Sequence, residues 1–117
     1  MRPVAEVSGI VEAPADHVWE VLTDDLLPDS EQHATVEVRD RTIAVQGGWW
    51  YRGEWSVEPH PRGAMLVHRV LNVAQRARWG VPLANRFFIG FADRTREAFR
   101  ERLTRIGATL NCPTHLT

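Results

Sequence analysis

The most chemically versatile side chain in this sequence is the imidazole of His68, which precedes Asn72 by four residues. Side chains at even spacing along a β-strand point to the same face of the sheet, so His68 and Asn72 would share one face. An imidazole in that position could hydrogen-bond a ligand carbonyl or act as a general acid or base. The alternative is a histidine that faces water beside Arg69, or one that is buried with its hydrogen bonds satisfied.

A second group of interest is aromatic. Trp49, Tyr51 and Trp55 alternate with polar residues and would form one face of a strand. They could line a pocket for a flat apolar ligand, because such sites are mostly hydrophobic with a few polar groups. They could equally form core packing against Phe91, Thr95 and Phe99. Tyr51 carries the only phenolic hydroxyl in the chain, so Tyr51 and His68 are the candidates for a catalytic role.

Other chemistries find little support in the residue pattern. The single cysteine, Cys112, is close to His115 only in sequence, and a nucleophile needs an oriented base. The five histidines are scattered, and none has a second ligand at metal-binding spacing. Nucleotide-binding and serine-hydrolase motifs are absent from the sequence. We therefore expect neither a metal nor a cofactor.

Charge is distributed unevenly along the chain. Residues 1–40 hold ten acidic residues against two arginines, a net charge of −8, whereas residues 41–117 hold twelve arginines against five acidic residues, a net charge of +7. Such asymmetry could mark a nucleic-acid surface, but no block of five like charges occurs. Acidic residues also interrupt the arginines of the C-terminal segment. We expect the two parts to neutralise each other and predict no nucleic-acid partner.

Length and composition are typical of one globular domain. The chain has 117 residues, of which 44% are hydrophobic and 25% charged. It contains no apolar stretch long enough to span a bilayer, and Glu6 and Glu12 interrupt any apolar signal-like run near the start. A single cysteine cannot form an internal disulfide. We expect a cytoplasmic protein without a membrane span, formed by residues 1–117 as a single domain.

The first elements predicted along the chain are a strand and a short helix. Residues 4–12 are rich in β-branched side chains and predict a strand. Pro14 is suited to a first helical position, and Asp16 favours the positive end of the helix dipole. We predict a helix over about residues 14–23, ended by the segment 24–30, because Pro28 disfavours helical backbone.

The middle of the chain predicts strands joined by short turns. Residues 49–58 alternate in polarity, and in the strand that follows Leu66, His68, Val70 and Asn72 would share the inner face. The predicted strands cover residues 34–38, 42–46, 49–58 and 64–73, with turns at 39–41 and 59–63.

A long helix is predicted near the C-terminus. It would begin at Pro82, end at Gly107, and carry an apolar stripe at helical spacing with arginines on the opposite face. The stripe comprises Phe88, Phe91, Ala92, Thr95, Ala98, Phe99, Leu103 and Ile106. A helix of about 24 residues is about 36 Å long, longer than a small sheet can cover unless the sheet curls around it. The fold class is therefore α+β, with a helix-grip arrangement of a curved antiparallel sheet around this helix.

The order of these elements, and several segments in detail, resemble the SRPBCC (START/Bet v 1-like) superfamily. Residues 7–24 resemble its opening, in which a strand runs through an Ala-Pro step into a helix bearing Val-Trp, and residues 53–59 and 63–67 are similar to its last two strands. The resemblance covers residues 4–110. Relatives include lipid and hormone carriers, coenzyme Q-binding proteins, and polyketide cyclases and aromatases.

The resemblance implies a small hydrophobic ligand, of polyketide, lipid or isoprenoid type, in an internal pocket, and leaves open whether the protein is a cyclase or only a binding protein. The expected ligand-binding residues are Trp49, Tyr51, Trp55, His68, Asn72, Phe88, Phe91 and Thr95.

One departure from the family pattern supports an alternative function. Only five strands can be counted here, fewer than the family has, and a shortened sheet would expose an edge. Trp50, expected to face outward, could then meet another chain. The alternative is a non-catalytic interaction module that forms a homodimer or binds a partner through this Trp-rich strand.

Overall fold

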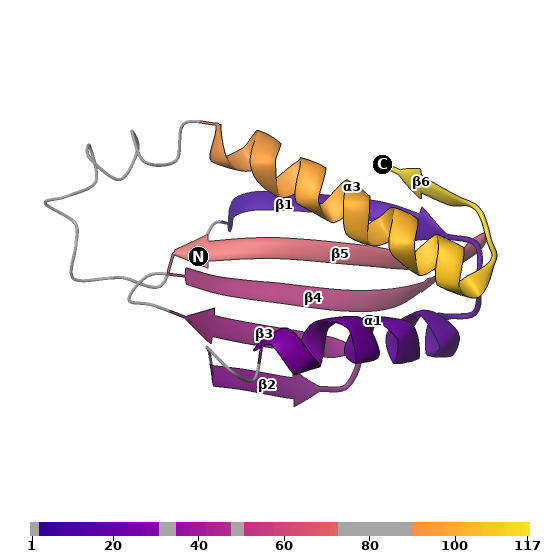
Figure 1. The fold of residues 1–117 in the computed structure, drawn as a ribbon, viewed down its shortest axis with the longest axis horizontal. Helices are drawn as coiled ribbons and strands as arrows, with labels where there is room; N and C mark the ends of the chain where they lie inside the picture. Colours follow the sequence, from indigo (N-terminus) through magenta and orange to yellow (C-terminus); the bar gives the residue numbers. More distant parts are fainter. Residues whose placement is uncertain (1–2, 31–34, 48–50, 73–89) are drawn as a thin grey trace, which may run out of the picture.

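The computed structural model describes residues 3–30, 35–47, 51–72 and 90–117. This part of the chain forms six antiparallel strands and two helices, which confirms the α+β class (Figure 1). The strands are β1 (Pro3–Val11), β2 (Thr35–Arg39), β3 (Thr42–Gly47), β4 (Tyr51–His60), β5 (Gly63–Asn72) and β6 (Thr114–Leu116). The helices are α1 (Ala15–Ser30) and α3 (Phe91–Leu110).

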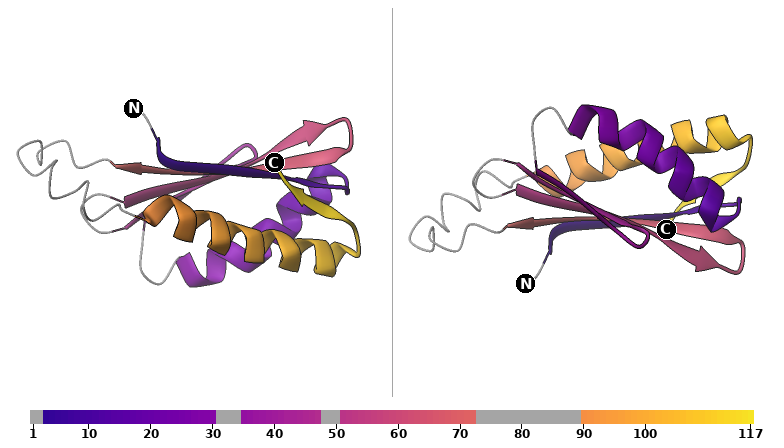
Figure 2. Two further views of the ribbon diagram at one scale, coloured as in Figure 1. Left: turned by 90° about the horizontal axis from the view of Figure 1, so that it is seen from above. Right: turned by 90° about the horizontal axis from the view of Figure 1, so that it is seen from below.

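The sheet is open and has the strand order β2-β3-β4-β5-β1-β6. Strands β2 to β5 follow one another as hairpins, and β1 pairs with β5 on one side and with the short β6 on the other. Both helices pack on the same face of this sheet (Figure 2). The core therefore lies between one sheet face and the pair α1 and α3.

The core is apolar and contains side chains from the sheet and from both helices. Leu22 of α1, Ile43 of β3, Leu66 of β5, and Phe99 and Ile106 of α3 are each at most 1% exposed. Helix α3 approaches the sheet closely over β1, where a Cβ added to Gly9 would lie 2.7 Å from a methyl carbon of Leu103. A larger residue at position 9 would force the Leu103 side chain to move and would also crowd the backbone oxygen of His115, 3.1 Å away.

The predicted alternation of β4 and β5 is confirmed where side chains are described. Gly53, Trp55 and Val57 are buried on the inner face of β4, whereas the residues between them are more exposed. On β5, Leu66, His68 and Val70 are buried on the same face.

The predicted end of the first helix is wrong. Helix α1 continues through the segment 24–30 to Ser30, with Pro28 in its last turn. Leu26 is buried one turn beyond Leu22, so the added turn extends the apolar face over the sheet. Packing of Leu26 outweighs the local cost of the proline, which is smaller near a helix end because few backbone bonds follow it.

The predicted turn at 59–63 is too long. Strand β4 includes Pro59 and His60, and only Pro61 and Arg62 separate it from β5. The amide of Val57 donates to the carbonyl of Arg41 on the β3 side, so the nitrogen of Pro59 points to that same side. Strand β3 begins at Thr42, opposite Ser56, and the missing N–H of Pro59 therefore breaks no ladder bond.

The C-terminal helix also differs from its prediction. The expected start at Pro82 lies outside the described residues, and α3 begins at Phe91 after Gly90. It ends at Leu110, followed by Asn111 in left-handed conformation, and Gly107 lies inside the helix. Of the predicted stripe, Phe99, Leu103 and Ile106 are buried, but Ala92 and Ala98 are exposed because the first turns of α3 do not pack directly on the sheet.

Strand β6 was not predicted. It pairs with Gly9–Val11 and brings the number of described strands to six. Its position is fixed further by His115, whose Nε2 lies 2.7 Å from Oε2 of Glu12.

Ion pairs cross strands on the sheet face opposite the helices. Arg69 pairs with Glu6 at 3.2 Å, and these two residues are partners in the β1–β5 register. Arg52 contacts Glu54 at 3.2 Å and Glu37 of the edge strand β2 at 3.4 Å. The open face of the sheet is therefore polar around these ion pairs.

Candidate functional site

A hollow of about 330 Å³ lies between the first half of α3 and the strands β4 and β5. The helices α1 and α3 diverge toward this end of the sheet (Figure 1). The sheet side of the hollow is formed by Trp55, His68 and Val70. The helix side is formed by Phe91, Arg94, Thr95, Ala98, Phe99 and Arg102. We call this hollow the α3 pocket; its volume is near the lower end of the range of small-molecule sites, about 300–1,000 Å³.

Three nearly parallel rings form the centre of the α3 pocket. Trp55 and His68 are register partners on β4 and β5, and their rings stack with centroids 3.9 Å apart at 20°. Phe99 of α3 stacks on Trp55 at 5.8 Å and 13°. The wall of the pocket is thus aromatic and is held from both the sheet and the helix.

The hydrogen bond of His68 fixes its tautomer. Its Nδ1 lies 3.1 Å from the backbone oxygen of Glu54. A carbonyl oxygen can only accept, so Nδ1 carries the hydrogen and donates it. Burial, and secondarily the positive charge of Arg102, lower the pKa of His68 to about 4, against the opposing effect of the Glu54 hydrogen bond. The ring is therefore neutral near pH 7, and its Nε2 is a hydrogen-bond acceptor.

The acceptor Nε2 has no partner in the described part of the chain. His68 is only 5% exposed, and its one hydrogen bond is made by Nδ1. Among the described side chains, no fully buried nitrogen or oxygen lacks a partner. Nε2 must therefore reach accessible space, and the space that His68 lines is the α3 pocket.

Two guanidinium groups complete the lining. Arg102 is held by Asp25 of α1, and its guanidinium carbon lies 5.0 Å from the ring centroid of Trp55. Arg94 lies in the first turn of α3 and makes no ion pair with any described residue. Gly90, which precedes the helix, provides no side-chain cap for its free N–H groups. This end of the pocket is positively charged.

The described lining suits binding better than acid–base catalysis. It supplies one neutral acceptor, two cations and the Thr95 hydroxyl, and no carboxylate is found among these residues. A pKa of about 4 leaves the His68 imidazole a weak base at neutral pH. The described part of the pocket thus lacks a matched acid and base.

The structure brings together four of the eight residues predicted for ligand binding. Trp55, His68, Phe91 and Thr95 all line the α3 pocket. Tyr51 and Asn72 are register partners at the ends of β4 and β5, but their side chains lie outside the described part. Trp49 and Phe88 lie outside the described residues altogether.

Sequence reasoning missed the two arginines of the pocket. Arg94 was assigned to the outer face of the helix, yet it lines the hollow because the first turns of α3 overhang the sheet. Arg102 follows Thr95 by seven residues and Ala98 by four, so helical spacing already placed it beside the stripe. Arg102 was not counted in the apolar stripe because its side chain is charged.

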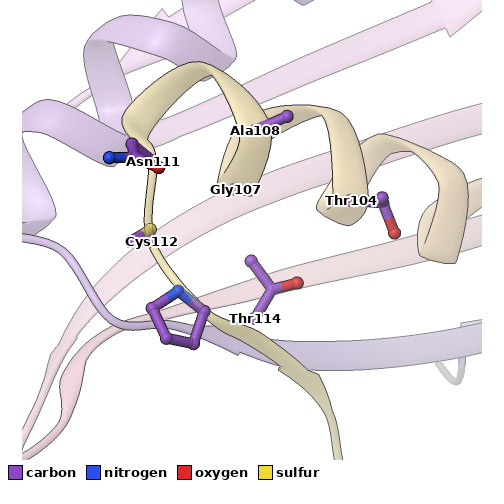
Figure 3. A pocket seen from close by; sticks show the side chains of 7 residues that line it. Thr104, Gly107, Ala108, Asn111, Cys112 and Thr114 are labelled. Carbon is purple, nitrogen blue, oxygen red and sulfur yellow. The ribbon is translucent and has the colours of Figure 1, made fainter.

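A second hollow lies where α3 turns into β6 (Figure 3). It is shallow, with a volume of about 580 Å³, and is lined by Thr104, Gly107, Ala108, Asn111, Cys112, Pro113 and Thr114. Burial raises the pKa of the Cys112 thiol above its usual range. His115 pairs with Glu12 instead of this thiol. No activated nucleophile is assembled here.

Within residues 3–30, 35–47, 51–72 and 90–117, no group of three or more histidine, cysteine or acidic side chains could hold a metal ion. In the same ranges, neither helix is long and apolar enough to cross a membrane.

Comparison with protein-family models, with curated proteins and with solved structures finds no match for this chain. The resemblance to the SRPBCC superfamily therefore stays a prediction.

Proposed function

We propose that this protein binds a small, largely apolar organic molecule in the α3 pocket, within a helix-grip arrangement of the SRPBCC type. The observation that carries the proposal is the unpartnered Nε2 of His68 inside an aromatic hollow. Nε2 reaches the space of the pocket, so it can accept a hydrogen bond from a bound molecule. That bond, together with burial of the ligand's apolar surface, would favour binding.

The aromatic wall supports the same proposal. Trp55, Val70 and Phe99 contribute apolar groups to the lining, and Ala98 contributes a small side chain on the helix side. Binding sites for small molecules combine apolar surface with a few polar groups that fix orientation. In the α3 pocket these groups are the His68 acceptor, the Thr95 hydroxyl and the two arginines.

The proposal does not include catalysis. A cyclase or aromatase activity stays a prediction, since Tyr51, its second candidate, has no described side chain. The alternative of an interaction module also stays a prediction, because Trp50 lies outside the described residues. The cross-strand ion pairs of the open sheet face do not favour an apolar interface there.

The proposal is tested by native mass spectrometry of the purified protein beside its denatured mass. A bound molecule that leaves on denaturation supports the proposal, and its mass narrows its chemical class. Binding of a hydrophobic fluorescent dye provides a second readout for protein purified without ligand.

A matched pair of variants locates the site. Ala98→Trp places an indole in the α3 pocket, and Ala108→Trp places the same group in the second hollow of the same helix. Both alanines are exposed, so neither change disturbs the core. We expect Ala98→Trp to abolish binding and Ala108→Trp to leave it intact. Absence of any bound molecule, together with dye binding that Ala98→Trp does not reduce, would refute the proposal.

A further inference from the structure

We propose that the ligand of the α3 pocket is a one- or two-ring aromatic acid that carries a hydroxyl group, with the hydroxyl donating to Nε2 of His68 and the acid group held by Arg94. This inference rests on the proposed function and specifies its ligand.

The hydroxyl follows from the tautomer of His68. Because Nδ1 donates to the oxygen of Glu54, Nε2 can only accept, and its ligand partner must be a donor. A cationic ammonium group would meet the guanidinium of Arg94, which has no ion pair with a described side chain. Like charges at close range disfavour that ligand, so the donor is a neutral group, and a hydroxyl is the simplest such donor on an aromatic ring.

The acid group follows from the charge of the lining. Two guanidinium groups line the pocket without any carboxylate among the described lining residues. Asp25 already neutralises Arg102, whereas Arg94 has no ion pair with a described side chain. Arg94 also lies in the first turn of a helix of 20 residues, where free N–H groups and the helix dipole favour an anion. Asp93 opposes this in part, but it is exposed and does not line the pocket.

The number of rings follows from the volume and the aromatic lining. Trp55, His68 and Phe99 stack on one another in successive pairs, so aromatic groups bound the pocket. A volume of about 330 Å³ accommodates one or two fused rings with substituents but not a long acyl or poly-β-keto chain. A hydroxylated aromatic acid satisfies the volume, the acceptor and the charge together.

Three probes separate these features: 6-hydroxy-2-naphthoate, 2-naphthoate without the hydroxyl, and methyl 6-hydroxy-2-naphthoate without the charge. Affinity is measured by calorimetry at fixed salt. We expect the hydroxy acid to bind best, with loss of the hydroxyl weakening binding roughly 5-fold and esterification roughly 10-fold.

Two arginine variants locate the acid group. Arg94→Gln removes the guanidinium that lines the pocket, and Arg96→Gln makes the same change at an exposed residue of the same helix that does not line it. We expect Arg94→Gln to weaken binding of the hydroxy acid roughly 10-fold and to leave binding of the ester unchanged. Arg96→Gln should change neither affinity. Because the hydroxyl is tested by changing the probe, no substitution of the buried His68 is needed.

The outcomes are distinct. If the ester binds as tightly as the acid, the pocket does not recognise the acid group. If 2-naphthoate binds as tightly as the hydroxy acid, the pocket does not recognise the hydroxyl. If no probe binds while dye binding is still blocked by Ala98→Trp, the inference fails and the proposed function stands. If dye binding also fails to respond to Ala98→Trp, both fail.

Discussion

The imidazole of His68 stacks on the indole of Trp55 with ring centroids 3.9 Å apart, and the two residues are direct partners across β4 and β5. This contact depends on the register of the hairpin, which the two-residue turn at Pro61 and Arg62 sets. A shift of one residue would send one of the two rings to the opposite sheet face. The turn, distant from the pocket, therefore determines its aromatic wall.

Acidification should destabilise the fold through His68. An exposed histidine has a pKa of about 6.5, as it would in the unfolded chain, whereas burial lowers the pKa of His68 to about 4 in the fold. The unfolded state therefore binds a proton first as the pH falls. Stability is lost between about pH 6.5 and pH 4, by a total on the order of 3 kcal/mol, and no further loss from this group follows below pH 4.

The control for this prediction is His68→Gln, which does not titrate and keeps an amide donor for the Glu54 carbonyl. Urea denaturation of both proteins at a series of pH values gives two stability curves. We expect their difference to change across this window, while carboxylates that titrate there affect both curves alike. Parallel curves would show that His68 is not held neutral by the fold.

Asp25 should stabilise the packing of α1 against α3. Its carboxylate contacts Arg102 and also Arg105, the latter at 3.2 Å. Asp25→Asn should lower the free energy of unfolding by about 1 kcal/mol, because these groups are partly shielded from water. The matched change Asp16→Asn removes a more exposed pair with Arg41 and should cost less than about 0.5 kcal/mol. Equal effects in chemical denaturation would contradict the distinction.

Gly107→Ala should destabilise the protein, although alanine is the better helix former. A Cβ at position 107 would lie 2.6 Å from the Cγ2 of Thr114 and 3.0 Å from the backbone oxygen of Cys112. Cys112 lies in the connection from α3 to β6 and Thr114 is the first residue of β6, so the Thr114 side chain and this connection must shift. We expect a loss of about 1–3 kcal/mol and faster amide hydrogen exchange in β6. A gain in the free energy of unfolding would show that the contacts with Thr114 and Cys112 can adjust without destabilising the fold.

Phe99 should contribute more stability than Phe91, although both line the α3 pocket. Phe99 is 1% exposed and packs on Trp55, whereas Phe91 is half-buried. Phe99→Ala should cost about 3–5 kcal/mol and Phe91→Ala less than about 2 kcal/mol. Denaturant titrations of the two variants test this order, and a larger loss for Phe91→Ala would reverse it.

The sequence predicted the elements whose pattern is repeated over many residues. Ten-residue strands such as β4 and β5 show enough alternation to assign Trp55 and His68 to one face. The same reasoning located the stripe of Phe99, Leu103 and Ile106 on α3. Seven of the nine residues that line the α3 pocket lie on these two patterns.

The errors arose where tertiary packing outweighs a local signal. Pro28 lies within α1 because Leu26 packs on the core, and Gly107 serves a close contact with Thr114 instead of ending its helix. Strand β6, with three residues, is too short to show a period. The role of Arg94 depends on how α3 lies over the sheet, which composition does not encode.

The place of β1 in the sheet has a consequence for synthesis of the chain. Its neighbours are β5 and β6, so β1 leaves the ribosome well before the strands that pair with it. Strands β2 to β5 can pair in the order in which they emerge, because each adjoins its predecessor. Until β5 is complete, β1 carries unpaired backbone groups and apolar side chains. A nascent chain paused before residue 72 would therefore be a target for chaperones that recognise extended apolar segments.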